Sequence, residues 1–185
     1  DACPNLKLVV TRSAGYDHID LPAAKARGIA VCNVPDYGAH AIAEHAVGLM
    51  LAVGRNTIRG NERYRNEKHF DDAGMSGVEL FGKTLGIIGT GRIGLHSARI
   101  GKGFGMRVIA FDTYPNPQMA AEQGFSYVSL PELLAQSDFI TIHVPLSTET
   151  HHLINAETLA LVKPGAILVN ASRGPVVDTE ALKQA

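Results

Sequence analysis

Residues 84–94 read TLGIIGTGRIG. The apolar run Leu85–Ile88 is typical of a short buried strand in a parallel sheet, and glycines follow where such a strand would turn into a helix. The spacing matches the G-x-G-x-x-G fingerprint of a dinucleotide-binding turn. Gly89 would permit the tight turn, Gly91 would let the backbone approach a pyrophosphate, and Gly94 would let the helix lie close to the strand.

An acidic residue ends the next apolar run. A second strand is predicted over Arg107–Phe111, and Asp112 follows it, 18 residues after the last fingerprint glycine. Its carboxylate can accept a hydrogen bond from a ribose 2′-hydroxyl and would repel a 2′-phosphate, so the sequence favours NAD over NADP. Thr90, Arg92 and Ile93 are expected to contact the pyrophosphate, because free N–H groups and the helix dipole favour an anion there. The alternative is a glycine-rich turn that arises by chance, but the strand, the glycines, the helix, the second strand and the terminal acid occur in the order that the fingerprint requires.

The composition is that of a globular chain with a small-molecule partner. The chain has 185 residues, is 45% hydrophobic and carries a formal net charge of -1. Its charges are interspersed, which argues against nucleic acid or a membrane surface as a partner. No apolar run approaches the roughly 20 residues of a membrane span and no signal-peptide pattern is present, which favours the cytoplasm. Cys3 and Cys32 lack metal-ligand spacing, and Cys32, in an apolar run, is expected to be a small core residue.

Strands and helices are predicted to alternate after Lys83. This alternation predicts an α/β fold with a Rossmann-type, doubly wound parallel sheet. The predicted strands cover residues 84–88, 107–111, 126–128, 139–143 and 166–170, and the predicted helices cover residues 92–104, 118–123, 131–136 and 156–162.

The sequence before residue 66 predicts a separate βαβ unit followed by a long helix. The helix extends from Ala39 to about Arg65, because apolar residues recur at helical spacing, and a connecting loop is expected over residues 66–82. The βαβ unit comprises a buried strand over residues 6–10, a helix over residues 21–27 and a second strand over residues 29–32.

Five motifs occur in the order found in one enzyme family. They are residues 12–20 (RSAGYDHID), 43–45 (AEH), the glycine fingerprint, 143–146 (HVPL) and 170–174 (NASRG). Together they span essentially the whole chain, which resembles the D-isomer-specific 2-hydroxyacid dehydrogenases. Residues 35–45 (PDYGAHAIAEH) and 111–115 (FDTYP) are most similar to the D-lactate dehydrogenase branch.

The resemblance implies a domain arrangement. In this family the cofactor domain is inserted into a discontinuous, flavodoxin-like substrate domain, and the protein is expected to be a homodimer. Residues 1–36 would then be part of the substrate domain and residues 37–185 the NAD-binding domain, incomplete at its C-terminal end. The chain begins without a methionine and stops inside a helical pattern that starts near Asp178, so further segments are expected at both ends. The family's catalytic glutamate and histidine would lie after Ala185.

Arg173 is the predicted catalytic residue. Its guanidinium is a rigid fork of donors that stays charged, so it can hold a 2-oxo acid bidentately and stabilise the developing alkoxide. It follows a predicted strand, at the edge where α/β sheets place ligands. By the resemblance, Ala14 and Gly15 would offer backbone N–H groups to the substrate carboxylate, and Tyr37 would place its hydroxyl in the cleft. The structural alternatives are a surface arginine, an ordinary turn and a packing tyrosine.

Three more residues are expected at the cofactor. Val144 and Pro145 should pass beside the nicotinamide ribose or the adenosine, and Ala171 fits the nicotinamide end, with plain loop structure as the alternative. None of the eight histidines matches the family's catalytic histidine. His143, at a strand end, is expected to have a structural role rather than to transfer a proton directly. No cluster of side chains predicts a metal.

The resemblance implies an NAD-dependent oxidoreductase that reduces a small 2-oxo acid, such as pyruvate, to the D-2-hydroxy acid by hydride transfer. One alternative is an NADH-sensing binding protein similar to the C-terminal-binding-protein corepressors, in which the surface carries the function. Another is a different Rossmann-type enzyme, such as a methyltransferase. That alternative fits Asp112 but leaves Arg173 and the turn at Gly15 unexplained.

Overall fold

The computed structural model describes residues 3–68 and 72–185. The chain falls into two units, Asp1–Ala39 and His40–Ala185. The division follows Ala39, whereas the sequence places a domain boundary after residue 36. Over the described ranges, no helix is long and apolar enough to cross a membrane.

The first unit is a βαβ motif, as the sequence predicts. Its two strands are parallel, with Val9 paired to Val31. The connecting helix begins where the Asp20 carboxylate accepts a hydrogen bond from the N–H of Ala23 at 2.9 Å, which satisfies one of the free amides of the first turn. The elements are β1 (Leu8–Val10), α1 (Leu21–Ala26) and β2 (Ala30–Cys32).

The predictions that the strand over residues 6–10 is buried and that Cys32 is a core residue are wrong. Leu8 is 50% exposed and Val10 is 60% exposed, and Cys32 is exposed as well. Only Thr11 and Ala24 are buried among the described residues of this unit. Two strands of three residues and one short helix have too little surface in contact with one another to enclose a core.

The second unit alternates strands and helices. Its described elements, in chain order, are α2 (Ala39–Gly54), α3 (Thr57–Glu67), β3 (Thr84–Ile88), α4 (Arg92–Gly103), β4 (Arg107–Phe111), α5 (Pro117–Gln123), β5 (Ser126–Tyr127), α6 (Leu130–Gln136), β6 (Phe139–Ile142), α7 (Ala156–Leu159), β7 (Ile167–Asn170), the 3₁₀ turn Gly174–Val176 and α8 (Thr179–Gln184).

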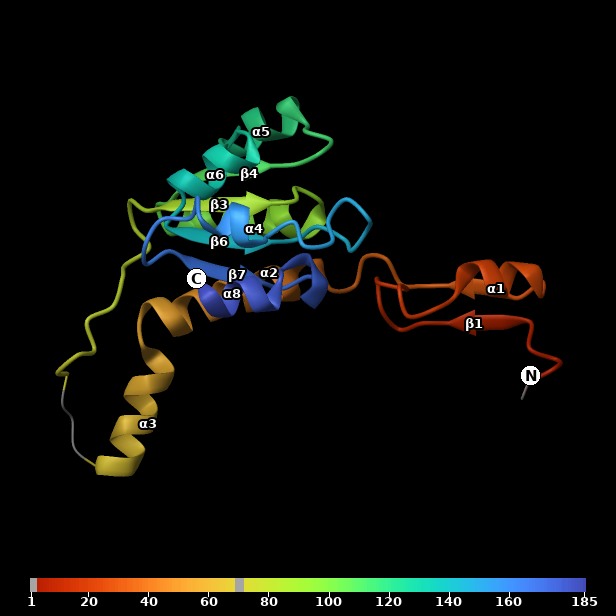
Figure 1. Ribbon diagram of the computed structural model, residues 1–185, viewed down its shortest axis with the longest axis horizontal. Coiled ribbons are helices and arrows are strands. Elements are labelled where there is room, and N and C mark those ends of the chain that lie inside the picture. The colour runs from red at the N-terminus through yellow and green to blue at the C-terminus, as the bar shows by residue number, and fades with distance from the viewer. Residues whose placement is uncertain (1–2, 69–71) are drawn as a thin grey trace. The chain divides into compact units, whose positions relative to one another are not determined.

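The five strands of this unit form one parallel sheet in the order β5-β4-β3-β6-β7. Figure 1 shows β4, β3, β6 and β7 side by side in this order. From β3 the sheet grows through β4 to β5, and the chain then adds β6 on the other side of β3. The strand order therefore reverses between β3 and β6, and ligands of such sheets bind at the carboxyl ends of the strands at this point. The predicted fold class is confirmed.

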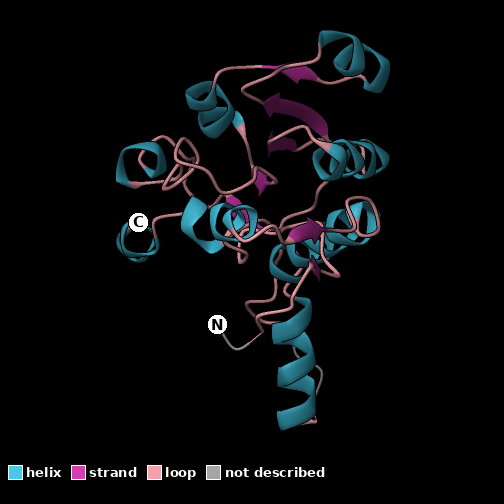
Figure 2. Cartoon of the chain, turned by 90° about the vertical axis from the view of Figure 1, so that its right-hand side faces the viewer, coloured by secondary structure: helices cyan, strands magenta, loops and turns pink. Residues whose placement is uncertain are grey.

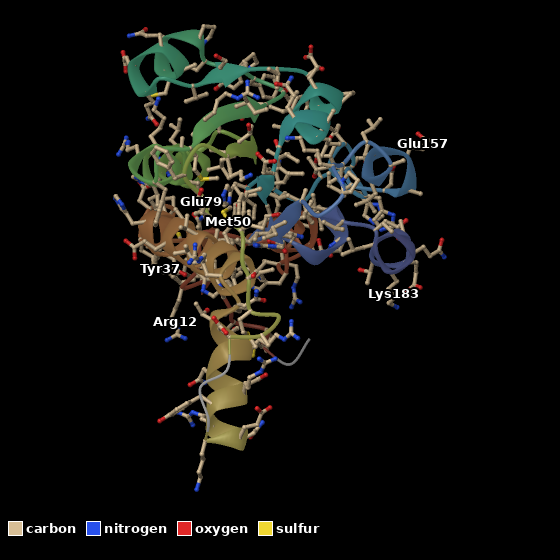
Figure 3. The ribbon with its side chains drawn as sticks, turned by 90° about the vertical axis from the view of Figure 1, so that its left-hand side faces the viewer. Arg12, Tyr37, Met50, Glu79, Glu157 and Lys183 are labelled. Atoms are coloured by element: carbon tan, nitrogen blue, oxygen red, sulfur yellow. The ribbon has the colours of Figure 1, made fainter. Side chains whose placement is uncertain are left out.

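Helices cover both faces of the sheet (Figure 2). Leu85 of β3 packs against Gly101 of α4, whereas its neighbour Gly86 faces Leu133 of α6. Met50 of α2, labelled in Figure 3, is fully buried in the core on the α4 face. The central strand β3 is buried along its whole length, which explains its mainly apolar sequence.

The predicted single helix over residues 39–65 is instead two helices. The break follows Gly54, whose carbonyl oxygen accepts a hydrogen bond from the N–H of Val78 at 2.7 Å. Asn56 then adopts a left-handed conformation with φ 54°, and its side-chain amide donates to the carbonyl of Ser76 at 3.1 Å. The helix that follows, α3, has no buried residue and extends away from the sheet (Figure 1).

Candidate cofactor and substrate site

The glycine loop joins β3 to α4 with close backbone packing. Gly89 has a φ of +94°, and its N–H donates to the carbonyl of Phe111 at 2.8 Å. A Cβ at this position would lie 2.8 Å from the side chain of Val144, and a Cβ at Gly94 would collide with the carbonyl oxygen of Gly89. Only glycine therefore fits at these two positions.

The start of α4 is open to a ligand. Gly91 is the N-cap residue and provides no side-chain cap, and a Cβ built on it would meet nothing within 4 Å. Arg92 follows on the exposed surface and Ile93 is half-buried. Backbone amides at an uncapped helix N-terminus can bind an anion, so this loop fits the pyrophosphate of a dinucleotide.

Asp112 lies directly after β4 and faces the glycine loop. Its Oδ2 accepts hydrogen bonds from the N–H of Thr90 at 2.6 Å and from the Thr90 hydroxyl at 2.8 Å. Its Oδ1 accepts the N–H of Tyr114 at 2.8 Å. The carboxylate therefore has a fixed direction at the carboxyl edge of the sheet. Thr90, expected at the pyrophosphate, has its hydroxyl on this carboxylate.

The loop that carries Arg173 is held by Asn170, the last residue of β7. The Asn170 Oδ1 accepts hydrogen bonds from the N–H and the hydroxyl of Ser172 at 3.0 and 2.8 Å. Its side-chain amide donates to the carbonyl of Arg173 at 2.8 Å. Arg173 is half-buried, and its Nη1 donates to the carbonyl of Ser172 at 3.2 Å. Sequence reasoning missed this role of Asn170, although an asparagine at the end of a strand is a common turn-forming residue.

Residues after β6 complete this edge of the sheet. The Val144 side chain lies beside Gly89, and the carbonyl of Pro145 accepts a hydrogen bond from the Thr150 hydroxyl at 2.6 Å. Because β3, β6 and β7 are adjacent and parallel, their carboxyl ends bring together the glycine loop, Val144, Pro145 and the Ala171 turn. The structure thus gathers the predicted cofactor residues and Arg173 at one edge.

The predicted substrate residues of the first unit lie in and beside one loop. The Asn33 side-chain amide donates to the carbonyl of Ala14 at 2.7 Å, and the Ser13 hydroxyl donates to the carbonyl of Gly15 at 2.6 Å. Tyr37 is 67% exposed. It lines an open hollow together with Arg12, and Figure 3 labels both residues.

Three residues in or next to this loop were not predicted as site residues. Asn33 and Ser13 fix its backbone, and His18 lines the same hollow as Tyr37. Ser13 and His18 belong to the RSAGYDHID motif, which is the signal that could have identified them. Asn33 offers no such signal, because its partner Ala14 lies 19 residues earlier in the chain.

His143 is half-buried between β6 and α4. Its Nε2 lies 2.9 Å from the Ser97 hydroxyl and 3.0 Å from the Thr141 hydroxyl. Its Nδ1 is one of two buried side-chain N or O atoms that have no hydrogen-bond partner among the described residues. Desolvation lowers the pKa of His143 from 6.5 to about 4, so the ring is neutral at pH 7 and joins two elements beneath the glycine loop.

This burial predicts a pH-dependent stability. The folded-state pKa of about 4 lies below the unfolded value of 6.5, so the unfolded chain binds an additional proton between these values and stability falls as the pH drops through this window. Because of His143, we expect the free energy of unfolding to be about 2 kcal/mol lower at pH 5 than at pH 7.

Urea unfolding of the wild type and His143→Gln at both pH values measures this difference. The control is His151→Gln, because His151 is exposed. Equal pH dependence in the wild type and His143→Gln would show that the buried ring does not stay neutral.

The comparison with known proteins places this geometry in a family. Residues 47–185 match the model of the NAD binding domain of the D-isomer specific 2-hydroxyacid dehydrogenases. The chain belongs to this family. The predicted resemblance is confirmed, and the second unit contains the family's NAD-binding domain.

Individual members of the family give the scale of the similarity. The chain is 44% identical over 180 residues to D-lactate dehydrogenase of Escherichia coli (strain K12), covering 97% of this chain and 54% of that protein. It is 45% identical over 184 residues to D-3-phosphoglycerate dehydrogenase of Mycobacterium bovis, covering 100% of this chain and 35% of that protein. A crystal structure of D-lactate dehydrogenase from Aquifex aeolicus, complexed with NAD and lactic acid, has a TM-score of 0.89 and 44% identity. The match covers 98% of this chain and 54% of that one. The chain therefore spans about half the length of the D-lactate dehydrogenases that it matches.

Proposed function

We propose that the complete protein is an NAD-dependent dehydrogenase that reduces a small 2-oxo acid, such as pyruvate, to the D-2-hydroxy acid. The observation that carries this proposal is the placement of Arg173, held by Asn170 at the sheet edge that also carries the glycine loop. A guanidinium beside a dinucleotide site suits a substrate that has a carboxylate and a ketone side by side. The chain is about equally identical to a D-lactate dehydrogenase and to a D-3-phosphoglycerate dehydrogenase. The substrate is therefore tested directly.

In the proposed mechanism, the bound nicotinamide supplies the hydride for the ketone carbon. Arg173 binds the 2-oxo acid and stabilises the charge that develops on the ketone oxygen. Ala14 and Gly15 hold the substrate carboxylate through backbone N–H groups, with Tyr37 as a further substrate contact. Val144 and Pro145 pass beside the nicotinamide ribose or the adenosine, and Ala171 borders the nicotinamide end of the cofactor. By the family resemblance, a catalytic histidine supplies the proton for the product hydroxyl, and none of the histidines in residues 1–185 matches it.

A substrate screen tests the proposal. The complete protein is assayed with pyruvate, glyoxylate, hydroxypyruvate and bulkier 2-oxo acids, using NADH and NADPH in parallel. We expect the highest kcat/KM for a small 2-oxo acid with NADH, and a D-configured product by chiral analysis. Tight NADH binding without turnover of any 2-oxo acid would contradict the proposal and favour a cofactor-sensing binding protein.

We also propose that the protein works as a homodimer in the cytoplasm. The reaction consumes NADH, which other oxidoreductases must regenerate in the same compartment. Light scattering of the purified protein tests the dimer, and fractionation of the cells that make it tests the compartment.

A further inference from the structure

Three side chains from separate elements form a chain of hydrogen bonds beside the glycine loop. The Thr90 hydroxyl lies 2.8 Å from the Asp112 Oδ2 and 2.8 Å from the Tyr127 hydroxyl. An ionised carboxylate only accepts hydrogen bonds, so the single hydroxyl hydrogen of Thr90 points to Asp112. The Tyr127 hydroxyl must then donate to the Thr90 oxygen. The hydrogen bonds therefore run in one direction, from Tyr127 through Thr90 to Asp112.

The tyrosine is held rigidly at its end of this chain. Tyr127 lies on β5, where it pairs with Ala110 of β4, two residues before Asp112. Its half-buried ring packs edge-on against Phe125, with ring centroids 5.3 Å apart and an angle of 74° between the planes. Because strand pairing and ring packing both fix the phenol, its hydroxyl limits the positions that the Thr90 hydroxyl can adopt.

We propose that Tyr127 is a positioning residue for cofactor selection: through Thr90 it holds the Asp112 carboxylate in the direction that accepts a ribose 2′-hydroxyl and repels a 2′-phosphate. The proposal rests on the role of Asp112 in NAD binding. Two oxygens of a carboxylate offer about four acceptor positions, and three are taken by the N–H and hydroxyl of Thr90 and the N–H of Tyr114. The remaining acceptor position is available to the ribose hydroxyl, and it is already oriented before the cofactor binds.

Removal of the phenol hydroxyl is the direct test. In Tyr127→Phe the ring and its packing remain, but the Thr90 hydroxyl loses the donor that limits its position, so its hydrogen bond directs the Asp112 carboxylate less strictly toward the 2′ position. We expect the Kd for NADH to rise about fivefold, and the preference for NADH over NADPH to fall about tenfold because NADPH is repelled less. Fluorescence titration of the complete protein with each nucleotide, without any 2-oxo acid, measures both values. The result is therefore independent of which substrate is reduced.

Two further variants separate positioning from general stability. Tyr64→Phe makes the same chemical change at a tyrosine that is 60% exposed on α3, and should leave both Kd values unchanged. Thr90→Val removes the middle hydroxyl with little change of shape, and should itself lower the NADH preference. In the double variant, Tyr127→Phe should add almost nothing to Thr90→Val, since the coupling passes through Thr90.

The proposal is overturned if Tyr127→Phe leaves the NADH/NADPH ratio within twofold of the wild type, or if the effects of the two substitutions are additive. A lower melting temperature with an unchanged ratio would also overturn it, because that result assigns Tyr127 to packing alone. If Tyr127→Phe does not fold, Thr90→Val decides the question: an unchanged NADH/NADPH ratio in that variant would overturn the proposal.

Discussion

Replacing Arg173 by lysine is expected to lower kcat/KM for the 2-oxo acid about 10³-fold. Lysine keeps the positive charge but loses the planar fork that can bind the carboxylate and the ketone oxygen together. The Kd for NADH should remain within about twofold of the wild type, because the glycine loop and Asp112 follow β3 and β4, whereas Arg173 follows β7. Steady-state kinetics with the best 2-oxo acid, combined with NADH titration, checks both expectations.

A matched control exists on α3. Arg65→Lys makes the same substitution at an exposed arginine, and its kinetic constants should equal those of the wild type. If Arg173→Lys keeps more than about a tenth of the wild-type kcat/KM, a bidentate catalytic role for Arg173 is refuted, because the loss of one oxyanion donor already costs about a hundredfold or more.

Gly94→Ala is expected to weaken NADH binding by about tenfold or more and to lower the unfolding free energy by about 2 kcal/mol. The added methyl group would collide with the carbonyl oxygen of Gly89. To relieve this collision, α4 must move away from the loop, and the amides at its N-terminus move with it. Chemical unfolding and NADH titration measure the two effects.

Gly103→Ala provides the comparison within the same helix. Gly103 is the last residue of α4, and a Cβ there would meet nothing within 4 Å. Alanine is favoured over glycine in helices by up to about 1 kcal/mol, so this variant should be as stable as the wild type or slightly more stable. Equal effects at Gly94 and Gly103 would show that close packing of the loop is not the cause.

The second unit could be predicted from the sequence because its signals are local. The buried strands β3, β4 and β6 are mainly apolar, and the glycines of residues 89–94 mark a turn where the backbone must pack closely. The break in the predicted long helix could not be foreseen in this way. It depends on a hydrogen bond between Gly54 and Val78, and the sequence between them gives no indication that the two would meet.

The candidate site was predictable to a similar extent. The sequence indicates Asp112 and Arg173, because each follows a strand at the ligand-binding edge. It does not show what orients them. Tyr127 lies 37 residues from Thr90, and only the pairing of β5 with β4 brings its hydroxyl into place. The exposed apolar residues of the first unit were also missed, since an apolar run predicts burial without specifying what covers it.

The reversal of strand order has a consequence for the way the chain folds. During synthesis, β3, β4 and β5 emerge first and can pair in that order, whereas β6, the other neighbour of β3, is made later. Until Phe139–Ile142 is available, one side of the central strand has unpaired N–H and C=O groups and is temporarily the edge of an unfinished sheet. Such an edge can pair with another chain. Between the completion of β5 and the arrival of β6, this side of β3 is therefore open to pairing with another chain.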